Sequence, residues 1–147
     1  MNHDLHDGIR DQASASRQRL EDATVLLRAS RWRGSMYIAG YAVECLLKTK
    51  LMQIYDCKNL RDLEWELQRR LILSTHRTVF THQLANLLKL APGSDRLKQN
   101  RELWPLFNNV NRWTPNWRYT PKPAARTEAT EFITSVEQII HWINNNL

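Results

Sequence analysis

The sequence is poor in the residues that break helices or cross-link chains. Among 147 residues there are four glycines, five prolines and two cysteines. An all-β domain of this length would need more turn residues, so the scarcity of glycine and proline favours helices. Cys45 and Cys57 fit no metal-ligand spacing. We therefore expect two reduced thiols in a cytoplasmic protein.

Several functional classes are disfavoured by what else is missing. No apolar run is long enough for a transmembrane helix, so we expect no contact with a membrane. The first residues are polar and acidic, unlike a signal peptide. The chain has no glycine-rich phosphate loop and no clustered cysteines and histidines. We accordingly predict no metal site and no bound cofactor.

Acidic residues are scarce in one stretch of the chain. Residues 89–126 carry eight basic and two acidic side chains, whereas residues 127–147 carry three glutamates and no lysine or arginine. The net charge of the whole chain is +6. A basic region of this kind attracts phosphate groups, including those of RNA. A solvated face that only keeps the protein in solution is the alternative interpretation.

Apolar residues recur with helical spacing along most of the chain, and no stretch alternates as a strand would. We predict an all-α fold: an up-down bundle of four main helices with one or two short extra helices. Residues 1–10 are expected to be a flexible N-terminus and residues 11–147 one helical domain. The expected helices cover residues 11–30, 34–55, 60–73, 82–91, 95–112 and 124–145.

Some details of these helices can be predicted as well. Leu60, Leu63, Leu67 and Leu71 form the apolar stripe of the third helix, and Thr81 is a plausible N-cap for the fourth. Pro105 falls inside the helix expected over 95–112, so we expect a kink there or two separate pieces.

The helix expected over residues 34–55 is apolar on nearly every side, which places it at the centre of the bundle. Gly40 and its small neighbours would let another helix approach closely. Glu44 and Lys48 interrupt the apolar surface, and their spacing of four residues lets them pair on one face.

The stretch from Tyr37 to Leu51, YIAGYAVECLLKTKL, resembles the signature helix of the HEPN family, in which small residues precede a tyrosine, here Tyr41, a Glu-Cys pair and Leu-Lys. Two later pieces follow in the order the family gives. These are His82-Gln83-Leu84 and Trp113 with Arg118-Tyr119. The resemblance covers roughly residues 15–145.

The resemblance implies a HEPN-like helical bundle that forms a homodimer. It implies a protein of toxin–antitoxin or defence type, as many HEPN proteins are metal-independent ribonucleases, with a nucleotidyltransferase antitoxin as a partner. The alternative within the family is a non-catalytic module that binds a nucleotide or a nucleotidyltransferase.

HEPN nucleases carry an arginine, four to six residues, and then a histidine. Arg77 and His82 have this spacing, and so do Arg69 and Arg70 with respect to His76. Because arginine is frequent in this chain, such spacings also arise by chance. His82 is the candidate base, since histidine titrates near neutral pH, and Arg77 or Arg118 is the candidate phosphate partner.

Each candidate also has a structural interpretation. His82 can instead bond to the backbone or to Glu44. Glu44 and Lys48 either form a stabilising pair or line a polar binding pocket with Tyr41. Trp113 and Tyr119 either stack on the bases of single-stranded nucleic acid or fix their loop to the bundle.

Overall fold

The computed structural model describes residues 6–147, and these form helices and turns with no β-strand; a single isolated bridge joins Gly8 and Asn59. The prediction of an all-α fold is confirmed for this part of the chain. The helices are α1 (Ile9–Arg28), α2 (Trp32–Ile54), α3 (Leu60–Arg69), α4 (Leu84–Lys89), α5 (Asp95–Lys98), α6 (Trp104–Val110), the 3-10 helix η1 (Pro115–Tyr119) and α7 (Arg126–Asn146). None of the described helices is long and apolar enough to cross a membrane.

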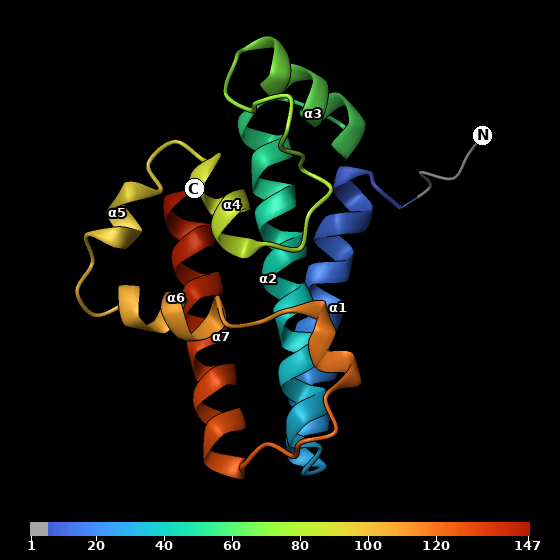
Figure 1. Cartoon of the computed structure of the whole chain (residues 1–147), viewed down its shortest axis with the longest axis vertical. Coiled ribbons are helices and arrows are strands. Elements are labelled where there is room, and N and C mark those ends of the chain that lie inside the picture. The colour runs from blue at the N-terminus through green and yellow to red at the C-terminus, as the bar shows by residue number, and fades with distance from the viewer. Residues whose placement is uncertain (1–5) are drawn as a thin grey trace.

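Three long helices make up the body of the molecule. They are α1, α2 and α7, with 20, 23 and 21 residues. Figure 1 shows α2 between the other two, with α1 antiparallel to it and α7 running in the same direction as α2. The return from α2 to the start of α7 is made by short helices, of which α3, α4 and η1 pack against α2 and α6 packs against α7. We predicted four main helices, but only the three long ones among the described helices exceed ten residues, and more short helices occur than the one or two expected.

The centre of the bundle is α2, as its apolar sequence predicts. Met36, Val43 and Leu47 are among its fully buried side chains. Two serine hydroxyls hold α1 against it: Ser16 Oγ donates to the carbonyl oxygen of Ala42 on α2, and Ser35 Oγ on α2 donates to that of Ala23, both at 2.7 Å. These bonds satisfy buried hydroxyls that would otherwise be costly to desolvate.

The first three helices end in the same way. Ser30, Asp56 and Leu71 have positive φ angles of 61°, 55° and 60°, and each is followed by an N–H that bonds to a carbonyl five residues earlier. This is the Schellman motif, in which glycine usually occupies the left-handed position. The motif ends α3 before Leu71, whose side chain is 90% exposed. The prediction that Leu71 belongs to the buried stripe is therefore wrong, whereas Leu60, Leu63 and Leu67 are buried.

The region expected to form one helix over residues 95–112 contains two, and the break lies at residues 99–103 rather than at Pro105. Pro105 sits in the first turn of α6, where no N–H is required of it. The prediction for α4 also needs correction. The helix begins at Leu84, and Thr81 is not its N-cap, although Thr81 Oγ1 accepts a hydrogen bond from the Gln83 backbone N–H at 3.2 Å.

The N-terminal segment is joined to the connection between α2 and α3. The backbone N–H of Ile9 donates to the carbonyl of Lys58 at 2.9 Å, and that of Leu60 donates to the carbonyl of Asp7 at 3.1 Å. Helix α1 begins at Ile9, two positions before the predicted start. Of the residues predicted to be flexible, 1–5 lie outside the described part of the chain.

Candidate functional site

A buried ion pair lies on α2, where the side chains of Glu44 and Lys48 meet across one helical turn. Lys48 Nζ donates to Glu44 Oε2 at 2.9 Å, and each side chain is only 7% exposed. The spacing predicted this intrahelical pair. Its burial means that each charge depends on the other, because an unpaired charge in this environment would be strongly disfavoured.

His82 is bound to the same carboxylate from outside the helix. Its Nδ1 lies 2.6 Å from Glu44 Oε1, while the imidazole is 56% exposed. When this carboxylate is ionised it only accepts hydrogen bonds, and Nδ1 then carries the proton in this contact. In the neutral ring Nε2 is then an acceptor. The structure thus joins Lys48, Glu44 and His82 in one chain of contacts that leaves the second ring nitrogen of His82 unused by any residue of the described region.

Aromatic rings surround this histidine. The Trp113 ring lies 6.4 Å from the His82 ring, and the Tyr41 ring lies edge-on 4.8 Å from Trp113 and 6.1 Å from His82, between ring centres. Trp113 Nε1 donates to the carbonyl of Tyr37 at 2.9 Å. This approach depends on Gly40, because a Cβ there would lie 2.1 Å from the indole.

Tyr41 is held in its protonated form. Burial is the main factor that raises the pKa of its hydroxyl, and the hydrogen bond with Tyr37 and the negative charge of Glu44 act in the same direction. The positive charge of Arg118 opposes them. The two tyrosine hydroxyls are 3.2 Å apart. Arg118 is therefore close enough to Tyr41 to influence its hydroxyl electrostatically.

The loop that carries η1 combines arginine with aromatic side chains. The guanidinium carbons of Arg33 and Arg112 lie 5.2 and 5.9 Å from the centre of the Trp117 ring, and that of Arg118 lies 5.7 Å from the Tyr119 ring. Trp113 is buried and fixes the loop to α2, whereas Tyr119 is 76% exposed. The burial of Trp113 agrees with the packing interpretation for that residue, whereas the exposed Tyr119 ring lies beside the Arg118 guanidinium.

Arg77 does not join this group of residues. It lines a separate hollow with His76 and Lys89, and its side chain makes no hydrogen bond to His82. A smaller hollow of about 260 Å³ lies beside His82, and Asn86, Asn111 and Trp113 contribute to its walls. The other matches to the Arg–His spacing, Arg69 and Arg70, both bind Glu66.

Sequence reasoning missed several residues that shape this site. Tyr37 and Arg33 were not assigned to the site, and Gly40 was expected to admit a helix rather than an indole. The available signal was Gly40 itself, because glycine inside a long helix usually marks a close approach by another group. Which group approaches depends on the tertiary fold.

The two cysteines remain free thiols, as expected. Burial raises the pKa of the Cys45 thiol to about 11, and it also raises that of Cys57. Among residues 6–147, no three His, Cys, Asp or Glu side chains gather in a way that would hold a metal ion.

Comparison with known proteins gives this chain no assigned relatives. No protein-family model matches it, and no curated protein or solved structure matches it significantly. Its fold class is therefore established by the helices described above, and its function has to be argued from the site.

Proposed function

We propose that this chain is a HEPN-type protein of toxin–antitoxin or defence type that cleaves RNA without a metal ion. The observation that supports this most is the contact between His82 Nδ1 and the buried carboxylate of Glu44, at 2.6 Å. A carboxylate bound to one imidazole nitrogen fixes the tautomer and orientation of the ring, and it leaves the other nitrogen as a base.

In the proposed reaction, His82 Nε2 accepts the proton of a ribose 2′-hydroxyl. The 2′-oxygen attacks the adjacent phosphorus, so that the O2′–P bond forms and the P–O5′ bond breaks. The 5′-oxygen leaves and takes up a proton from solvent water, and His82 returns the proton it accepted to solvent. The products are a 2′,3′-cyclic phosphate and a 5′-hydroxyl, with no net gain or loss of electrons.

Arg118 is the phosphate partner that the geometry favours over Arg77. Its positive charge lowers the pKa of Tyr41, whose ring contacts that of His82. Its guanidinium also lies against the exposed ring of Tyr119. Guanidinium groups match phosphate oxygens, and exposed aromatic rings stack on bases. Glu44 acts through His82 as a positioning residue, and Lys48 Nζ binds its other carboxylate oxygen at 2.9 Å.

Two further parts of the proposal rest on the resemblance to HEPN proteins. The active form is a homodimer, and a nucleotidyltransferase is the antitoxin partner. Sedimentation of the purified chain tests the first, and co-expression with an adjacent small nucleotidyltransferase gene tests the second.

The experiment is cleavage of total RNA by the purified protein in EDTA. We expect wild type to cleave, a folded His82→Ala variant to lose the activity, and His141→Ala to retain it, since His141 is exposed on α7 and does not line the hollow beside His82. Equal cleavage by wild type and His82→Ala, or none by either, would overturn the proposal.

A second candidate function is a non-catalytic module that binds a nucleotide or a nucleotidyltransferase. It is favoured by the complete pairing of Glu44, whose two carboxylate oxygens are bound by Lys48 and His82 as in a purely structural network. The hollow beside His82, with two asparagines and Trp113 in its walls, would bind the base of the nucleotide. Nucleotide binding without RNA cleavage would favour this function.

A further inference from the structure

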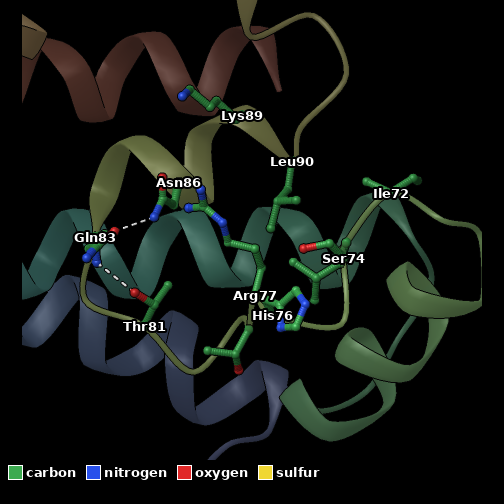
Figure 2. Close-up of a pocket in the computed structure, with 11 residues that line it drawn as sticks. Ile72, Ser74, His76, Arg77, Thr81, Gln83, Asn86, Lys89 and Leu90 are labelled. Atoms are coloured by element: carbon green, nitrogen blue, oxygen red, sulfur yellow. Dashed lines mark hydrogen bonds between the residues drawn. The ribbon is translucent and has the colours of Figure 1, made fainter.

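The long connection between α3 and α4, together with α4 itself, lines a second, larger hollow that is open to solvent. It has a volume of about 520 Å³, within the range of small-molecule sites. Figure 2 shows Arg77 reaching from this connection toward Asn86 on α4. His82 does not line the hollow, so it is separate from the site proposed for RNA cleavage.

The charges in this hollow all have one sign. Arg77, Lys89 and His76 are basic or can become so, and no residue of the lining is acidic. None of these three side chains forms a hydrogen bond or ion pair with another residue of the described region. Three donors without partners in a concave site are suited to an anion, and the planar guanidinium is suited to phosphate.

The other walls of the hollow divide into polar and apolar parts. Hydroxyls of Ser74 and Thr81 and the amide of Gln83 supply hydrogen-bonding groups, while Ile72, Leu73 and Leu90 supply an apolar surface. A bare inorganic ion would make no use of that apolar surface. A phosphate carried on a small apolar or aromatic group would use both.

The hollow is held in shape by bonds that are already formed. Glu64 on α3 accepts hydrogen bonds from the Thr78 hydroxyl and, at 2.9 Å, from the Val79 backbone N–H, which fixes the connection. The carbonyl of Leu90 accepts a bond from the Tyr55 hydroxyl at 2.7 Å. A pre-formed site loses less entropy when a ligand binds.

Gln83 and Asn86 line both this hollow and the one beside His82. The hydrogen bond between these two side chains therefore lies on the boundary between the hollows (Figure 2). This boundary favours a small ligand over an RNA strand that passes from one hollow to the other. We propose that the hollow lined by Arg77, His76 and Lys89 binds a small organic phosphate monoester.

Calorimetric titration of the full chain with phenyl phosphate, inorganic phosphate and benzyl alcohol tests this. We expect phenyl phosphate to bind at least tenfold more tightly than either other probe. Arg77→Gln and Lys89→Gln should each weaken it at least tenfold. Arg101→Gln should change nothing, because it removes the same charge at an exposed position outside the hollow.

Three results would overturn the proposal: no binding of phenyl phosphate, equal binding of inorganic phosphate, or equal weakening by Arg101→Gln. A single-stranded oligodeoxynucleotide that binds through Arg77 while phenyl phosphate does not would assign the hollow to nucleic acid instead. The titration uses no RNA, so its failure leaves the proposed cleavage at His82 untouched, and the reverse also holds.

Discussion

At the scale of single residues, the site depends on charges placed inside an apolar helix. Glu44 and Lys48 are both buried, and within residues 6–147 the only other group bound to the carboxylate is the half-exposed His82. Removing either member of such a pair leaves a desolvated charge, whereas replacing both with apolar residues does not.

Lys48→Met should lower the free energy of unfolding by about 3–5 kcal/mol, measured by urea denaturation. The double variant Glu44→Leu, Lys48→Met should recover most of this loss. As a control, Arg69→Met should change stability little, because Arg69 binds Glu66 at the surface. A single variant no less stable than the double one would contradict the buried pairing.

Two glycines of α2 provide a matched comparison. A Cβ on Gly40 would collide with the indole of Trp113 at 2.1 Å, whereas one on Gly34 meets nothing closer than 3.9 Å. Gly40→Ala should therefore destabilise the protein by about 1–3 kcal/mol. Gly34→Ala should be neutral or stabilise it by up to about 1 kcal/mol. Equal thermal midpoints for the two variants would show that Trp113 does not pack on Gly40.

The cysteines differ in their exposure to solvent, and both have raised pKa values. A raised pKa lowers the fraction of thiolate at any pH below it, and the thiolate is the reactive form. With iodoacetamide at pH 8, we expect slow labelling of Cys57 and almost none of buried Cys45, read by mass spectrometry. Labelling of Cys57 should accelerate as the pH rises. Labelling of Cys45 before Cys57 in the native protein would contradict this.

At the scale of elements, three helices end on residues that are unusual in the left-handed position. A non-glycine residue there costs about 1–2 kcal/mol, and less for aspartate. Leu71→Gly should thus raise the melting temperature, since the exposed leucine side chain contributes little burial. Gly93→Ala should conversely lower the melting temperature, because Gly93 has a φ of 84°, which an alanine adopts only with strain. A fall in melting temperature for Leu71→Gly would mean that its side chain has a partner.

The elements that could be predicted are those set by local patterns. The long helices α1 and α7 follow from apolar periodicity, α2 follows from its nearly continuous apolar sequence, and the Glu44–Lys48 pair follows from one turn of helix. The break at residues 99–103 and the end of α3 before Leu71 could not be predicted in the same way. They depend on backbone bonds that compete with helix continuation, such as Ile72 N–H to the Leu67 carbonyl at 2.9 Å.

The site was predictable only in part, for a related reason. Glu44, Lys48, Tyr41, His82 and Trp113 do lie together. The contact of Trp113 with Tyr37 joins positions 76 residues apart, and the sequence has no local signal for it. The Arg77–His82 spacing shows the reverse case, in which residues close in sequence do not form one site. Residues near each other in an irregular connection can face different hollows.

At the scale of the whole molecule, the positive charge should make the affinity for RNA fall as the salt concentration rises. Each phosphate contact to a single strand adds about 0.7 to the slope of log affinity against log salt. With a 2′-O-methyl oligoribonucleotide, which resists cleavage, Arg118→Gln should reduce that slope by about this amount. Tyr119→Ala should weaken binding by about 1–3 kcal/mol without changing the slope. If the two variants changed the slope and the affinity identically, the proposed roles, phosphate contact for Arg118 and base stacking for Tyr119, would be excluded.

The most direct test of the proposed activity is the chemistry of the ends it leaves on RNA in EDTA. Attack by the 2′-hydroxyl, with His82 as base, predicts 2′,3′-cyclic phosphate and 5′-hydroxyl ends, and their loss in folded His82→Ala. Ends carrying 3′-hydroxyl and 5′-phosphate would show that water is the nucleophile. That result, or intact RNA, would contradict the role assigned to His82 and its contact with Glu44.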